Sequence, residues 1–202
     1  MAKQYRLTEI FYSIQGEGVM VGTPMMFVRF SGCNRQCRKD VDGFDCDTDH
    51  AQRMVLRADE ICQMLDAVRR RFGQIEWVLL TGGEPCMQVD AELIDALRDA
   101  GWRLAMETNG TIAPPRDLDW ITVSPKRSGP LALPSMVNEV KYVLGVGDPI
   151  PASPPNAHHR IISPASNGAV VDMDAVRWCI DLLKGNPSWR LSVQLHKLLG
   201  IR

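Results

Sequence analysis

Three cysteines lie within the stretch CNRQCRKDVDGFDCDTD, which begins at Cys33. Three residues separate Cys33 from Cys37, and eight separate Cys37 from Cys46. Thiolates at such short spacing can converge on one inorganic centre. One interpretation is a tetrahedral zinc site that His50 completes. The other is a 4Fe-4S cluster in which three cysteinates hold three irons and the fourth iron is left for an external ligand.

The elements that must position these thiols alternate between short apolar runs and amphipathic segments. The apolar runs predict strands at 7–12, 25–30, 76–80, 103–106, 120–123, 139–144, 160–162 and 190–195. Amphipathic periodicity predicts helices at 59–72, 91–100 and 174–184, the second capped by Asp90. Seven strands after residue 20 and three helices in 202 residues are too few for a complete eight-fold barrel. We therefore predict an α/β fold, an incomplete (open) TIM-like barrel of parallel strands with few helices, with residues 1–202 forming a single domain.

Residues able to do chemistry follow the predicted strands one after another. The cysteines follow 25–30, TGGEP follows 76–80, ETNG follows 103–106, SPK follows 120–123, SPAS follows 160–162, and QLHK lies near the end. Barrels place their active sites at the carboxyl ends of the strands. We expect these segments to meet at one site.

Composition limits the classes of partner. The 23 basic and 24 acidic side chains are interspersed and give a net charge of -1, so no broad cationic face is expected for nucleic acid. The apolar runs are too short to span a bilayer, and the first residues lack a secretion signal. We expect a cytoplasmic protein with reduced thiols, in which ligation outranks disulfide bonding.

Seven segments resemble radical S-adenosylmethionine (SAM) enzymes, specifically the 7-carboxy-7-deazaguanine synthase family: EIFYSIQGEG, FVRFSGCN, CDTD, LLTGGEP, METNGT, SPK and QLHKLLGIR. The resemblance implies a radical SAM core and a lyase of queuosine and 7-deazapurine biosynthesis. Its reaction contracts the ring of 6-carboxy-5,6,7,8-tetrahydropterin to 7-carboxy-7-deazaguanine with loss of ammonia. It also implies a 4Fe-4S cluster, SAM and Mg²⁺ as cofactors, a flavodoxin or ferredoxin as electron donor, and a homodimer.

Residue by residue, the resemblance assigns the cluster to Cys33, Cys37 and Cys46, and Mg²⁺ to Thr48. The positions that correspond to SAM contacts are Asp45, Asp47, Gly82, Gly83, Glu84, Ser124, Pro125, Lys126, Ser163, Pro164, Ala165 and Ser166. The carboxypterin positions are Ile14, Gln15, Gly16, Arg29, Thr81, Glu107, Gln194 and, through its terminal carboxylate, Arg202.

The chain departs from the usual radical SAM pattern in its cysteine spacing. Residues 38–45 supply eight positions where the pattern has two, and Asp45 stands where an aromatic residue usually precedes the last cysteine. The added residues carry five charges and a glycine, so we expect them to project into water. Phe44 is a candidate for the displaced contact to adenine.

The sequence leaves two possible roles for each of two residues, and it leaves two alternative functions for the chain. Arg29 projects from the apolar run MMFVRF, where a guanidinium anchors a substrate carboxylate or pairs with an internal acid. His196 either lines the pocket or is structural. The alternative functions are a glycyl-radical-enzyme activase or another radical SAM enzyme, and a non-catalytic zinc-binding module.

Overall fold

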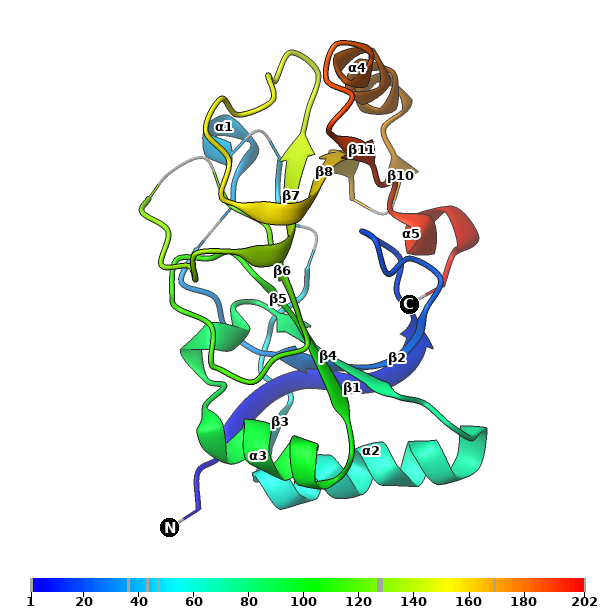
Figure 1. Ribbon diagram of the computed structural model, residues 1–202. Coiled ribbons are helices and arrows are strands. Elements are labelled where there is room, and N and C mark those ends of the chain that lie inside the picture. Colours follow the sequence, from blue (N-terminus) through cyan, green and yellow to red (C-terminus); the bar gives the residue numbers. More distant parts are fainter. Residues whose placement is uncertain are drawn as a thin grey trace.

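The computed structural model describes residues 2–35, 37–42, 44–46, 48–126, 129–168 and 170–201. These residues form a nine-stranded sheet in the order β11-β8-β7-β6-β5-β4-β2-β1-β3 (Figure 1). Neighbours from β2 to β11 are parallel, whereas β1 pairs antiparallel with both β2 and β3. The strands are β1 Tyr5–Ile14, β2 Pro24–Phe30, β3 Met54–Leu56, β4 Trp77–Gly82, β5 Arg103–Thr108, β6 Trp120–Val123, β7 Val137–Leu144, β8 Ala157–Pro164 and β11 Arg190–Leu191. β11 and β3 end the sheet without pairing with each other, so the prediction of an open, mostly parallel barrel is confirmed.

Three longer helices cover the outer face of the sheet: α2 (Ala58–Phe72), α3 (Ala91–Asp99) and α4 (Met173–Lys184). The Asp90 side chain accepts a hydrogen bond from the Leu93 amide and caps α3 as predicted, and Asp172 caps α4 in the same way. Shorter elements are α1 (Lys39–Asp42), α5 (Leu195–Leu199), the 3-10 turn η1 (Pro85–Met87) and the hairpin of β9 (Ser166–Asn167) with β10 (Val170–Val171). No helix within the described ranges is long and apolar enough to cross a membrane.

Alternate residues of each central strand belong to different cores. On β2, Met26, Val28 and Phe30 pack outward into a cluster with Ile61 of α2 and Leu93 of α3. Met25 and Phe27 point inward and form a smaller cluster with Trp77, Leu79 and Ala105. Because successive strand residues face opposite sides, the next inward position on each strand lies above this inner cluster.

One expectation from the sequence is wrong, and another holds in part. The predicted strand at 190–195 ends at Leu191, and Leu195 begins α5 with its amide bound to the carbonyl oxygen of Gly16, 2.9 Å away. The insertion at 38–45 exposes Arg38, Asp40, Val41 and Asp45, as expected, but it also forms α1, and Asp42 is buried and accepts a hydrogen bond from the Arg38 amide at 3.2 Å. At Leu195 a partner remote in the chain accompanies the change from strand to helix, whereas Asp42 bonds within its own segment.

Candidate functional site

A row of polar side chains crosses the inner face of the sheet, above the inner apolar cluster. Arg29 on β2 lies opposite Thr81 on β4, whose hydroxyl donates to Glu107 on β5 at 3.2 Å. Glu107 lies opposite Thr122 on β6, and Thr122 lies opposite Glu139 on β7. Arg29, Thr81 and Glu107 each lie one residue before the carboxyl end of their strand, which is the end where barrel enzymes bind ligands, whereas Glu139 lies nearer the start of β7.

Two adjoining cavities open above this row. The first is lined by the three cysteines of the opening stretch together with Phe44, Ser124 and Lys126. The second, of about 700 Å³, is lined by Arg29, Phe11, Phe27 and the segment after β1. Glu17, Thr48, Thr81, Glu107 and Gln194 line both cavities. A ligand in one cavity can therefore meet a ligand in the other, and the second volume falls within the range for small-molecule sites.

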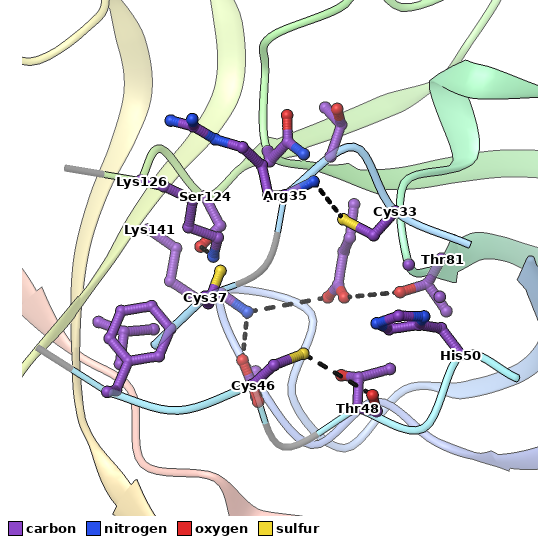
Figure 2. Close-up of a pocket in the computed structure, with 18 of the residues that line it drawn as sticks. Cys33, Arg35, Cys37, Cys46, Thr48, His50, Thr81, Ser124, Lys126 and Lys141 are labelled. Atoms are coloured by element: carbon purple, nitrogen blue, oxygen red, sulfur yellow. Dashed lines mark hydrogen bonds and ion pairs between the residues drawn. The ribbon is translucent and has the colours of Figure 1, made fainter. Parts of the chain in front are cut away.

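The sulfur atoms of Cys33, Cys37 and Cys46 point into the first cavity (Figure 2). Burial raises the pKa of the thiols of Cys33 and Cys37, so a bound cation is needed to hold them as thiolates. The ammonium of Lys126 acts electrostatically on both and reduces this cost. The donor set thus fits an iron-sulfur cluster.

His50 lines the same cavity. Among the described residues no three His, Cys, Asp or Glu side chains are arranged to hold a metal ion, so neither the three cysteines alone nor the cysteines with His50 form a preassembled metal site.

The loop after β4 reaches the cysteines because it has no side chain at Gly83. A Cβ atom on Gly83 would lie 1.9 Å from the carbonyl oxygen of Gly32. The amide of Gly83 donates to the Phe30 carbonyl and that of Glu84 to the Gly32 carbonyl, both at 3.0 Å. The end of β4 therefore rests directly on the backbone that leads into Cys33.

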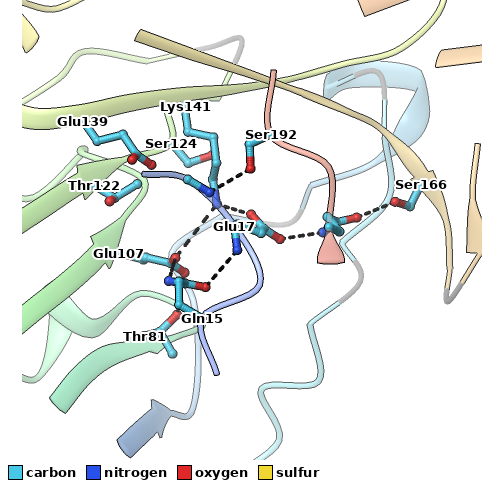
Figure 3. Close-up of polar contacts among 12 residues, drawn as sticks. Gln15, Glu17, Thr81, Glu107, Thr122, Ser124, Glu139, Lys141, Ser166 and Ser192 are labelled. Atoms are coloured by element: carbon cyan, nitrogen blue, oxygen red, sulfur yellow. Dashed lines mark hydrogen bonds and ion pairs between the residues drawn. The ribbon is translucent and has the colours of Figure 1, made fainter. Parts of the chain in front are cut away.

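A buried ion pair joins the segment after β1 to β7 (Figure 3). The Lys141 ammonium contacts the Glu17 carboxylate, and Glu107 Oε1 lies 4.0 Å from the same ammonium. Glu17 also accepts a hydrogen bond from Gln194 at 2.8 Å. Glu139, 1% exposed, is the third acid near Lys141; burial raises its pKa, and the charges of Glu107 and Glu17 add to this rise.

Sequence reasoning missed Glu17, Glu139 and Lys141. The signal was available, because Glu139 and Lys141 occupy alternate positions of the otherwise apolar run VNEVKYVL and must therefore face the same side of their strand.

Comparison with known proteins identifies the family. A 7-carboxy-7-deazaguanine synthase from Bacteroides thetaiotaomicron is 39% identical over 203 residues, covering 98% of this chain and 98% of the relative. One from Bradyrhizobium diazoefficiens is also 39% identical, covering 98% of this chain and 99% of the relative. The chain belongs to the 7-carboxy-7-deazaguanine synthase family. The crystal structure of QueE from Escherichia coli matches with a TM-score of 0.69 at 27% identity, over 96% of this chain and 95% of that one. No protein-family profile matches.

The structure brings the carboxypterin positions assigned from the 7-carboxy-7-deazaguanine synthase family into one place. Ile14, Gln15, Gly16, Arg29, Thr81, Glu107 and Gln194 all line the second cavity. Thr48, assigned to Mg²⁺, lines both cavities and so lies at their junction. Arg202 and the SAM position Asp47 lie outside the described residues. His196 also lines the second cavity, as one of its two alternatives required.

The positions assigned to SAM divide into two groups. Asp45, Gly82, Gly83, Ser124, Lys126 and Ser166 line the first cavity. Glu84, Pro125, Ser163, Pro164 and Ala165 are not among the described residues that line it. Glu84 is fully buried, and its carboxylate accepts hydrogen bonds from the Thr108 hydroxyl at 2.7 Å, the Asn109 amide at 2.8 Å and the Cys86 amide at 3.0 Å. These bonds tie the ends of β4 and β5 together.

Arg29 pairs with an internal acid and also faces the second cavity. Its Nε lies 3.0 Å from Glu9 Oε1, and it also lines the second cavity with 23% of its side chain exposed. A guanidinium has five N–H donors, so one bond to Glu9 leaves donors for a ligand carboxylate.

Phe44 lines the first cavity. Its ring centroid lies 5.2 Å from the ammonium of Lys126, which also donates to Ser124 Oγ at 3.1 Å. Phe44 therefore faces the site, even though the insertion that carries it departs from the usual radical SAM spacing.

Proposed function

We propose that the chain is a radical SAM lyase that converts 6-carboxy-5,6,7,8-tetrahydropterin to 7-carboxy-7-deazaguanine with loss of ammonia. Membership of the 7-carboxy-7-deazaguanine synthase family supports this function. The structural observation that carries it is the pair of cavities, one with three thiols and the other with a guanidinium, which share a common wall.

The first cavity would hold the cluster through Cys33, Cys37 and Cys46, with SAM against Gly82, Gly83 and the residues at the ends of β6 and β8. When bound, the cluster and SAM supply one-electron radical chemistry. The half-buried ammonium of Lys126 offsets part of the negative charge that the thiolates of Cys33 and Cys37 bring. Phe44 offers a flat apolar surface to the adenine ring.

The second cavity would hold the carboxypterin. Arg29 is suited to its carboxylate, since a guanidinium forms a bidentate pair with that group. Thr48 would bring a hydroxyl to Mg²⁺, a hard cation that binds oxygen ligands and keeps several waters. Gln15 donates through its side chain to Glu107 at 3.0 Å, which orients both side chains at the wall of the cavity. The electron donor is proposed to be a flavodoxin or ferredoxin, and the enzyme a cytoplasmic homodimer.

The test is anaerobic purification followed by incubation with SAM, a reductant, Mg²⁺ and the carboxypterin. We expect brown protein with about four irons per chain and formation of 7-carboxy-7-deazaguanine. Cleavage of SAM without this product would favour an activase or another radical SAM reaction. Colourless protein loaded with zinc would contradict the proposal and favour the binding module.

A further inference from the structure

The segment of residues 15–19, here called the strap, crosses from one end of the sheet toward the other. It leaves β1, yet its backbone is bound by residues that follow β11 or lie on β7. The Gly18 amide donates to Ser192 Oγ at 2.7 Å, the Val19 amide donates to Glu139 Oε2 at 2.8 Å, and the Gly16 carbonyl accepts from the Leu195 amide at 2.9 Å. In Figure 1 the blue chain after β1 accordingly lies beside the red helix α5.

The strap fits closely against β7. Gly18 has a φ of 71°, and a Cβ atom there would lie 2.4 Å from Glu139 Oε1. A side chain at this position would meet both the strained backbone conformation and the buried carboxylate. The strap can therefore lie this close to β7 only with glycine at position 18.

One ion pair fixes the centre of the strap. The side chains of Lys141 and Glu17 are only 7% and 14% exposed, and Gln194, which donates to Glu17, in turn accepts a hydrogen bond from the Ser166 hydroxyl (Figure 3). The charged groups that face Lys141 are Glu17, Glu107 and Glu139. Separating Glu17 from Lys141 would leave buried charges unpaired, which is strongly unfavourable.

The strap also forms part of the second cavity. Gln15, Gly16 and Glu17 line it, and the Gln15 side chain donates to Glu107 at its wall. The strap therefore supplies part of the wall of the cavity that Arg29 also lines.

We propose that Glu17 and Lys141 are positioning residues whose ion pair holds the strap across the open side of the barrel and so shapes the carboxypterin cavity. This inference rests on the proposed function for the identity of the ligand. The ion pair acts through the backbone of the strap. Its loss should weaken carboxypterin binding more than SAM binding, because SAM is assigned mainly to residues of other loops.

The first measurement needs no substrate. Hydrogen–deuterium exchange of the reconstituted protein reports the Gly18 and Val19 amides directly. Glu17→Gln keeps the volume and removes the charge, and we expect exchange of these two amides to rise about tenfold while amides of β2 and β4 are unchanged. Ser192→Ala removes the acceptor of the Gly18 amide without changing any charge and should raise its exchange in the same way. Glu76→Gln, an exposed acid outside both cavities, is the matched control and should change neither amide.

The second measurement is equilibrium binding of the carboxypterin and of SAM to the same proteins. Glu17→Gln should raise the carboxypterin Kd about 10- to 100-fold and the SAM Kd less than about threefold, since the loss of well-placed charged hydrogen bonds weakens affinity by about this factor. Unchanged exchange would overturn the proposal. Equal losses of both affinities with a lower Tm would also overturn it, because they indicate a role in stability alone. If the wild type binds no carboxypterin, the proposed function fails, and the exchange rates still decide whether the ion pair holds the strap.

Discussion

Gly83 rests on Gly32 with no room for a methyl group, since a Cβ atom on Gly83 would lie 1.9 Å from the Gly32 carbonyl oxygen. The contact is between backbone atoms, so neither side can move aside without shifting a strand end. It places the loop after β4 directly beside Cys33. Geometry at the cluster site therefore depends on a residue that is not itself a ligand.

Gly83→Ala should reduce both iron content and stability. The added methyl group must push apart two backbone segments, and overpacking of this kind costs about 1–3 kcal/mol. Iron analysis after reconstitution and thermal unfolding would measure the two effects. Gly185→Ala is the matched control, because the nearest atom to its Cβ is the Leu182 carbonyl oxygen at 3.9 Å. Full iron content in Gly83→Ala would show that the contact is not needed.

Cys46→Ala should abolish iron binding and SAM cleavage together. Cys46 is one of three thiols that line the first cavity, and two thiolates cannot hold three irons of the cluster. Visible absorption and iron content are the measurements. Cys62→Ala, on α2 and outside both cavities, should retain both properties. Retained cleavage in Cys46→Ala would contradict its assignment as a ligand.

Arg29→Ala should weaken carboxypterin binding more than SAM binding. Loss of a charged hydrogen-bonding partner costs about 1.5–3 kcal/mol, or about 10- to 100-fold in Kd. Isothermal titration with each ligand would separate the two affinities. Glu9→Gln removes the internal ion partner of Arg29 but keeps the guanidinium, so carboxypterin binding should largely remain. Equal effects of Arg29→Ala on both ligands would indicate that Arg29 serves only the internal ion pair.

Thr48→Ala should raise the Mg²⁺ concentration that gives half-maximal activity. The residue lies at the junction of the cavities, where its hydroxyl is proposed to bind the cation. A Mg²⁺ titration of product formation is the measurement. Thr48→Ser retains the hydroxyl and should restore the wild-type midpoint. If the Thr48→Ala titration matches the wild type, Mg²⁺ is bound elsewhere.

Acid should remove the contribution of Glu17 to stability. Burial alone would raise the pKa of Glu17. The charge of Lys141 and the hydrogen bonds that Lys141 and Gln194 donate to Glu17 instead lower this pKa from 4.5 to about 2. A carboxyl group whose pKa is lower in the folded than in the unfolded protein stabilises the fold at any pH above its unfolded pKa. This stabilisation is lost as the pH falls through the folded pKa. The difference in free energy of unfolding between wild type and Glu17→Gln should therefore shrink between pH 4.5 and about 2. Urea unfolding at a series of pH values would measure it, with Glu76→Gln as a control whose difference stays constant; a difference for Glu17→Gln that does not shrink would contradict the prediction.

Local patterns in the sequence were sufficient for the central strands and the three long helices. Apolar alternation and the capping Asp90 are properties of neighbouring residues, so they predicted β2, β4 and α3 closely. The strand at 190–195 failed because a partner remote in the chain, Gly16, binds the start of α5. The exposure of the insertion was predicted, but its five charges did not reveal that Asp42 turns inward and accepts a hydrogen bond from the Arg38 amide.

The candidate site was predictable where a residue type has a distinctive chemistry. Cysteines, paired glycines and an arginine in an apolar strand are such residues, and the structure brings them to two adjoining cavities. The Glu17–Lys141 pair was missed because 124 positions separate its members: the alternation of Glu139 and Lys141 places both on one face of β7 but does not name a partner for Lys141. Only a topology that brings the chain after β1 to β7 reveals it.

The polar row on the inner face also makes a shifted strand register energetically unfavourable. Shifting β5 by one residue would turn Glu107 toward the helices and Met106 toward the cavities, and a like shift of β7 would bury Lys141 beside Cys179 of α4. A carboxylate or an ammonium in those hydrocarbon layers would have no counter-ion. The side chains that line the cavities are therefore the same ones that disfavour a shifted strand register.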